Sequence, residues 1–144
     1  MSKIEIFCVT NIQSNLLESL KINLAGVGKK KFPKKYLNTR IGKNIQKKEK
    51  YYSELTFHYW FWKNKLSSYD DETWIGFCQK RRFWLKEKKT IKTYNDLKKN
   101  ILQKTPKSWR KYESVICKPI NVYNPKTMKL LKRGWKNLIK DPSI

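Results

Sequence analysis

The sequence is poor in acidic residues, histidine and closely spaced cysteines, and each shortage argues against a class of site. Only 11 residues are Asp or Glu against 34 Lys and Arg, so the net charge is +23. A field of this size attracts phosphates, nucleic acid or anionic lipid. The three cysteines form no C-x-x-C pair, which argues against a zinc site or a disulfide framework and favours small buried hydrophobes in a reducing cytoplasm. A single histidine is weak support for histidine catalysis.

Phosphate loops, signal peptides and membrane spans are also missing from the pattern. Gly26-Val-Gly28 lacks the spacing that a dinucleotide or P-loop motif requires. Lys3–Val9 is too short and too charged for the apolar core of a signal peptide, and no apolar run is long enough to span a bilayer. We therefore expect a cytoplasmic protein that is soluble, or peripheral at the inner face of the membrane.

The basic excess has two explanations at this stage. Lysine outnumbers arginine 29 to 5, and Asn, Ile and Tyr are frequent, which is the composition that AT-rich codons produce. Nucleic-acid readers depend more on arginine, whose planar fork pairs with phosphate and guanine. A small basic protein that binds single-stranded nucleic acid through lysines and exposed aromatic residues stays an alternative.

Hydrophobic patterning over the 144 residues predicts one α/β domain. Buried strands are expected at Ile4–Thr10 and Trp74–Cys78, with a further strand candidate at Ser114–Cys117. Glycines 26 and 28 are interpreted as chain breaks. Helices are expected over three segments: Lys48–Leu66, Tyr94–Lys104 and Lys126–Lys140.

The segment Lys48–Leu66 carries the strongest helical signal. Tyr52, Leu55, Tyr59, Trp62 and Leu66 repeat at helical spacing, and a second apolar face consists of Phe57, Trp60 and Phe61. A helix that is apolar on two sides predicts burial on both, so this segment is expected to be the core helix. Ser53 provides a cap for a shorter version of it.

Two predicted strand ends carry polar residues that suit ligand binding. Ligands of α/β sheets lie beyond the carboxyl ends of the strands, which here are Thr10-Asn11 and Gln79–Arg82. Arginine in this place grips a diphosphate through paired hydrogen bonds. The alternative is a basic loop whose arginine stems pack on neighbouring aromatic rings. Glu54 and His58 share one line of the aromatic helix and fit either acid/base chemistry or a surface pair.

Two blocks resemble the family called domain of unknown function 4422. These are Tyr51-Tyr-Ser-Glu-Leu-Thr-Phe-His-Tyr-Trp-Phe-Trp-Lys-Asn64 and Trp74-Ile-Gly-Phe-Cys-Gln-Lys-Arg-Arg-Phe-Trp84. The upstream Gly42-x-Asn44-Ile45 is similar to the family's Gly-Asp-Asn-Ile, and Ile6–Thr10 stands at the place of its first strand.

This resemblance implies a surface-polysaccharide function. The family occurs in capsular and exopolysaccharide gene clusters and is similar to GT-A glycosyltransferases. The expected fold is then an incomplete GT-A-like, nucleotide-sugar-binding sheet with flanking helices. The expected partners are a nucleotide-sugar donor and a glycan or lipid-linked acceptor. The resemblance and the strand ends together give these substrate-binding candidates: Thr10, Asn11, Asn44, Glu54, Thr56, Trp60, Lys63, Asn64, Gln79, Arg81 and Arg82.

Two departures from the family pattern modify this expectation. GT-A enzymes commonly carry a metal-binding Asp-x-Asp after a central strand, whereas the matching strand here ends in Gln79-Lys-Arg-Arg82, with Gln79-Lys80 replacing the family's His-Tyr. Arg81 and Arg82 are thus expected to neutralise the donor diphosphate without a metal or other cofactor. The family domain also continues past the position of Ile144. The chain is therefore expected to be a truncated, donor-side part of the domain. It would be a hexosyltransferase-like enzyme only if it were complete or a second chain completed it. The alternative is a non-catalytic partner subunit.

Overall fold

A computed structural model describes residues 3–87, 90–118, 131–132 and 135 of the chain. The chain divides into two compact units, Met1–Arg110 and Lys111–Ile144. In the second unit, Leu131, Lys132 and Trp135 have helical backbone, and the rest of the predicted C-terminal helix lies outside the described residues. The sheet and the helices that cover it belong to the first unit.

A four-stranded parallel sheet in the order β3-β2-β1-β4 forms the centre of the first unit. Its strands are β1 (Ile4–Thr10), β2 (Asn23–Gly26), β3 (Tyr36–Asn38) and β4 (Trp74–Gln79). The strands predicted at β1 and β4 are confirmed, but β4 is an edge strand in which only Cys78 is buried and four residues are half-buried. The interpretation of Gly26 as a chain break is wrong, because this glycine is the last residue of β2. A Cβ on it would lie 2.3 Å from the ring of Phe32, so the strand needs glycine for close packing.

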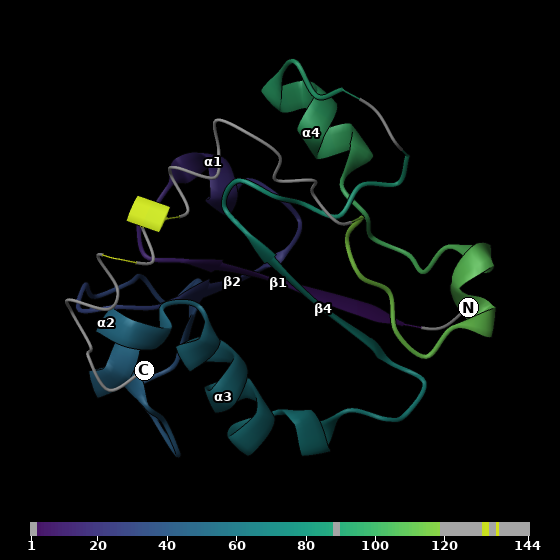
Figure 1. The fold of residues 1–144 in the computed structure, drawn as a ribbon. Helices are drawn as coiled ribbons and strands as arrows, with labels where there is room; N and C mark the ends of the chain where they lie inside the picture. Colours follow the sequence, from purple (N-terminus) through teal and green to yellow (C-terminus); the bar gives the residue numbers. More distant parts are fainter. Residues whose placement is uncertain (1–2, 88–89, 119–130, 133–134, 136–144) are drawn as a thin grey trace. The chain divides into compact units, whose positions relative to one another are not determined.

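Helices flank both faces of the sheet, which confirms the α/β class; α3 and α4 lie on opposite sides of it (Figure 1). The α-helices are α1 (Asn15–Glu18), α2 (Glu49–Tyr52), α3 (Leu55–Asn64) and α4 (Tyr94–Asn100). Short 3-10 turns are η1 (Gln46–Lys48), η2 (Leu66–Ser68) and η3 (Lys107–Lys111). None of the helices among the described residues has the length and apolar character needed to cross a bilayer.

Alternate side chains of β1 supply both cores. Phe7 and Val9 pack with α3 residues in one cluster, whereas Ile6 and Cys8 pack with α1 and α4 residues in the other. Because successive side chains of a strand point to opposite faces, one continuous apolar run is buried on both sides. The ring of Phe7 lies 4.9 Å from that of Phe61, centroid to centroid, which anchors α3 to the sheet.

The single helix predicted over Lys48–Leu66 is wrong in two respects. The chain breaks at Ser53, whose φ of 47° is left-handed and ends α2 before α3 begins. Only one apolar face of α3 is buried, that of Phe57, Trp60 and Phe61. The other stripe faces outward, with Leu55 56% exposed. Two apolar faces therefore did not mean two buried faces.

Two further expectations are corrected among the described residues. Ser114–Cys117 is irregular rather than a strand, and Cys117 is exposed rather than buried. Cys8 and Cys78 are buried as expected and are register partners on neighbouring strands. A hydrogen bond to Cys8, together with burial, raises the pKa of the Cys78 thiol above its usual range, so this thiol is unreactive. The predicted helix at Tyr94 ends at Asn100, four residues early.

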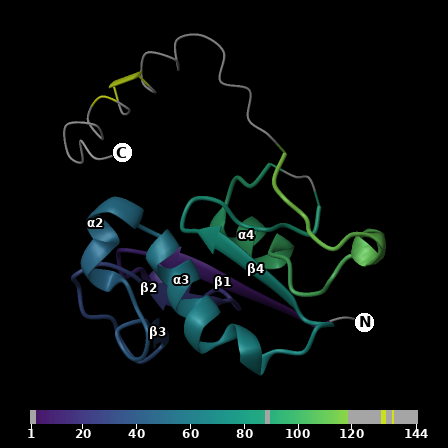
Figure 2. The same cartoon turned by 60° about the horizontal axis from the view of Figure 1, so that its bottom comes forward.

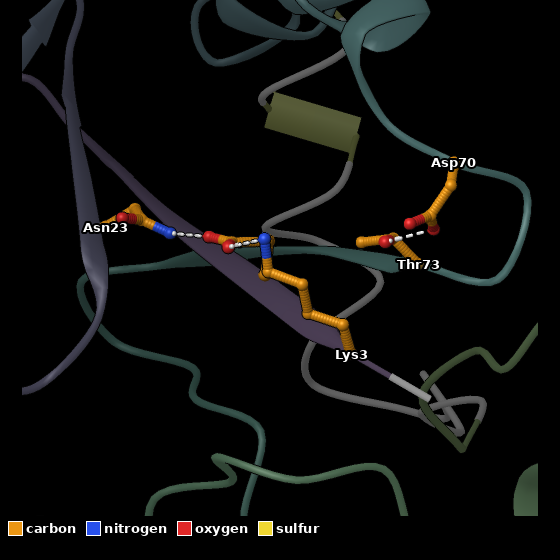
Figure 3. A network of polar contacts seen from close by, with 5 residues as sticks. Lys3, Asn23, Asp70 and Thr73 are labelled. Atoms are coloured by element: carbon orange, nitrogen blue, oxygen red, sulfur yellow. Dashed lines mark hydrogen bonds and ion pairs between the residues drawn. The ribbon is translucent and has the colours of Figure 1, made fainter. Parts of the chain in front are cut away.

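Two carboxylates near the amino end of the sheet have their own polar partners. Glu5 accepts a hydrogen bond from Asn23 Nδ2 at 2.7 Å and pairs with Lys3 Nζ at 3.2 Å. In the turn before β4, Thr73 Oγ1 donates to Asp70 Oδ1 (Figure 3). The carboxylates of Glu5 and Asp70 are thus engaged far from the carboxyl ends of the strands.

His58 gives a pH-dependent test of the packing between α3 and β4. Its ring stacks on Phe77, centroid to centroid at 4.4 Å, and burial lowers its pKa below the usual 6.5, against a smaller opposing effect of Glu54. The folded state therefore keeps this imidazole neutral. The contribution of the neutral ring to the free energy of unfolding is complete above pH 6.5 and is lost as the pH falls toward the lower folded-state pKa. We expect the free energy of unfolding in urea to decrease less between pH 7.5 and pH 5.5 in His58→Gln than in the native chain. Equal decreases would contradict this role.

Candidate functional site

The carboxyl ends of β1 and β4 meet at the point where the strand order of the sheet reverses. From β1 the chain adds β2 and β3 on one side and later places β4 on the other. Open α/β sheets bind ligands at such a switch point, outside the carboxyl ends of the strands. Val9 and Gln79 are register partners, so the segments that follow them start side by side.

A direct contact joins these two segments. Lys80 Nζ donates to Asn11 Oδ1 at 3.1 Å. Lys80 stands in a tight turn in which Gln79 and Arg82 exchange backbone hydrogen bonds of 3.3 and 2.9 Å. Lys80 is half-buried, whereas Arg81 and Arg82 are exposed and form no ion pair with a described carboxylate. Three cations therefore gather at the switch point, with one of them oriented by Asn11.

Thr10 shapes the turn after β1 rather than offering a free hydroxyl. Its side chain is buried, donates to the carbonyl of Ile12 at 2.8 Å and accepts from the Ile12 amide at 3.1 Å. Asn11 is exposed and is the polar group presented at this edge. Of the predicted residues, the structure thus brings together Thr10, Asn11, Gln79, Arg81 and Arg82.

A basic hollow adjoins this edge at β2 and β3. It has a volume of about 570 Å³ and includes Lys30, Lys31, Phe32, Lys34, Asn38 and Arg40 among its lining residues. Arg40 Nη2 donates to the carbonyls of Gly28, Lys29 and Lys30 at 3.3, 2.8 and 2.9 Å, which fixes the lysine loop. The sequence signal for this hollow was the lysine cluster after Gly28, which is equally typical of a solvated loop.

Three motif residues hold the loop that carries Arg40. Trp60 Nε1 donates to the carbonyl of Ile41 at 2.7 Å, and Asn64 exchanges hydrogen bonds with the Lys43 backbone at 2.8 and 2.9 Å. Asn44 donates to the carbonyls of Arg40 and Gly42. Gly42 has a φ of 79°, and a Cβ on it would lie 2.2 Å from Asn64 Oδ1. Trp60, Asn64 and Asn44 thus position the hollow's rim through backbone contacts.

The remaining predicted residues lie elsewhere on α3 or just before it. Thr56 is buried and donates to the carbonyl of Ser53, which stabilises the start of α3. Glu54 is half-buried near His58. Lys63 is exposed, with its Nζ 3.3 Å from the centroid of the Trp62 ring. These residues are not gathered at the switch point.

The hydrogen bonds of Asn64 generate a stability prediction. Asn64→Asp replaces the donor to the Lys43 and Trp60 carbonyls with a carboxylate oxygen that faces them. We expect a loss of roughly 1–3 kcal/mol of unfolding free energy, because two acceptors lose their partner and a charge is added. Urea unfolding measures it. Asn95→Asp makes the same chemical change at an exposed position of α4. The unfolding free energy of this variant should stay within about 0.5 kcal/mol of that of the native chain. Equal losses in both variants would contradict the role of Asn64.

Comparison with known proteins gives one finding. Among the described residues, no three His, Cys, Asp or Glu side chains lie together as a metal site. No curated protein and no solved structure matches the chain. The model of the domain of unknown function DUF4422 matches residues 6–137, which include the sheet, α3 and the turn at Lys80. The chain therefore belongs to the DUF4422 family.

Proposed function

We propose that this protein is a glycosyltransferase-like component of surface-polysaccharide synthesis that binds a nucleoside-diphosphate sugar at the carboxyl edge of the sheet. The contact between Lys80 and Asn11 carries the proposal, because it joins the cationic turn after β4 to the end of β1 at the topological switch point. Lys80, Arg81 and Arg82 then provide ammonium and guanidinium donors for the diphosphate.

The dimensions of the edge suit an elongated anionic ligand. Thr10, Gly26 and Asn38 are register partners across three neighbouring strands. Strands lie about 4.8 Å apart, so the distance from β4, which leads into the cationic turn, across β1 and β2 to β3 is roughly 14 Å. A nucleoside diphosphate is long enough to reach from the cationic turn to the hollow beside Phe32. In this arrangement the hollow, which Phe32 and Asn38 help to line, holds the nucleoside, and the sugar extends toward the acceptor.

The proposed chemistry is transfer of the sugar to an acceptor hydroxyl. The acceptor oxygen forms the new bond to the anomeric carbon, and the bond from that carbon to the diphosphate oxygen breaks. The nucleoside diphosphate leaves with the bonding electron pair, and the proton of the acceptor hydroxyl passes to the leaving diphosphate or to water. Negative charge on the leaving diphosphate grows in this step, and fixed cations stabilise it. We propose that Lys80, Arg81 and Arg82 fulfil this role without a divalent ion. The proposed acceptor is a glycan or a lipid-linked glycan, and the proposed location is the cytoplasmic side of the membrane.

Chelation tests the proposed absence of a metal. We expect UDP- or GDP-sugars to raise the thermal unfolding midpoint of the protein, and at least one of them to do so equally in 1 mM EDTA and in 5 mM MgCl₂. The physical reason is that side-chain cations replace the ion at the phosphates. Loss of the shift in EDTA would contradict metal independence, and no shift with any nucleotide sugar would contradict donor binding.

Substitution at the cationic turn tests the placement of the diphosphate. Lys80→Ala and the double variant Arg81→Ala/Arg82→Ala should each weaken donor binding by about tenfold or more, because each removes a charge-assisted hydrogen bond. Isothermal titration calorimetry measures the affinity. Lys98→Ala/Lys99→Ala removes two exposed charges from α4 and serves as the matched control. If the control loses as much affinity as the turn variants, binding follows net charge and the site is elsewhere.

A further inference from the structure

The outward side of α3 carries an apolar stripe that the core does not use. We define the outer face of α3 as Leu55, Tyr59 and Trp62, continued by Leu66 of η2. Leu55, Trp62 and Leu66 are 56%, 57% and 44% exposed, and Tyr59 is half-buried. Tyr59 and Trp62, at the centre of the stripe, pack edge to face with ring centroids 6.0 Å apart. Contiguous exposed apolar groups of this kind mark an interaction surface.

Lysines accompany this outer face. Lys63 places its Nζ over the Trp62 ring, and Lys65 stands directly before Leu66; both side chains are exposed. The helix α2 lies beside α3 (Figure 2). It adds two exposed tyrosines and Lys50, whose Nζ lies 5.4 Å from the Tyr51 ring centroid. Glu49 of α2 and Glu54, the N-cap residue of α3, are half-buried, and the exposed acidic turn at Asp70–Glu72 follows η2. From Leu55 to Ser68, apart from the neutral His58, the charged side chains are Lys63 and Lys65, so α3 and η2 themselves carry positive charge.

We propose that the outer face of α3 docks on the surface of a membrane that contains anionic lipids. Exposed Trp and Tyr rings suit the headgroup layer, and leucines enter the acyl boundary below it. Lysines beside them are attracted to anionic headgroups. This surface belongs to a helix whose opposite side is buried in the core, so the helix would lie in the plane of the interface. The inference does not depend on sugar transfer.

Two other occupants fit the contacts less well. A small ligand needs a concave site, and neither the basic hollow nor the hollow beside Ile4, Leu20 and Leu102 includes a residue of α3. Single-stranded nucleic acid would stack bases on exposed rings. The Lys63 ammonium already lies 3.3 Å above the Trp62 centroid, where it occupies one stacking side of that ring.

Vesicle flotation tests the proposal. The full chain should float with vesicles of phosphatidylcholine containing 30% phosphatidylglycerol, and much less with phosphatidylcholine alone. Trp62→Ser/Leu66→Ser should reduce binding by about tenfold, because both side chains leave the interface. Leu16→Ser/Ile41→Ser, which removes two exposed apolar side chains outside α3, should leave binding unchanged. Circular dichroism and nucleotide-sugar binding should be native in all variants.

A second pair of double variants reverses exposed charges and leaves the apolar side chains in place, so its effect on binding can be read apart from any effect on folding. Lys63→Glu/Lys65→Glu should reduce binding more than tenfold, since each lysine near an anionic surface contributes about fivefold. Lys98→Glu/Lys99→Glu on α4 changes the net charge equally and should have a much smaller effect. Equal losses in the two pairs, or no flotation of the native chain, would overturn the proposal. A further contrary result is possible with single-stranded RNA. If the native chain bound this RNA, and the α3 variants lost RNA binding but still floated with vesicles, the proposal would also be overturned.

Discussion

The burial of β1 on both faces is the constraint on which the rest of the first unit depends. Phe7 contacts the rings of Phe57, Phe61 and Phe77, while the next residue, Cys8, belongs to the opposite cluster with α4. β1 is also paired along both edges, with β2 and with β4. The same strand therefore sets the two layers of helices and brings the carboxyl ends of β1 and β4 together, from which the cationic turn follows.

The parts of the fold that the sequence predicts are those in which local pattern and burial agree. β1, apart from Glu5, and β4 are mainly apolar runs, because each strand contributes side chains to the clusters on both faces of the sheet. β2 and β3 were missed because they are four and three residues long and contain asparagine and glycine. Their stability comes from pairing with β1 and with each other, and Gly26 is required by the Phe32 ring, a contact from outside its own strand. Such tertiary causes leave no local signal.

The candidate site was predictable in its topology but not in its individual roles. Parallel strands that end in polar residues meet at one edge, which is why Asn11 and Lys80 come into contact. A family motif does not separate residues that touch a ligand from residues that hold a loop. Trp60 and Asn64 were expected to bind substrate, yet their described bonds go to the backbone of Ile41 and Lys43. Arg40, which no motif indicated, fixes the lysine loop.

The two proposals are geometrically compatible, because α3 connects the two surfaces. His58, near the start of α3, stacks on Phe77 close to the carboxyl end of β4, whereas Phe61, one turn later, reaches Tyr69 before β4 begins. α3 therefore runs opposite to the strands and starts at their carboxyl edge (Figure 1). If its outer face lies in the headgroup layer, the cationic turn stands beside the membrane surface. A donor held there would meet a lipid-linked acceptor without either partner leaving its own phase.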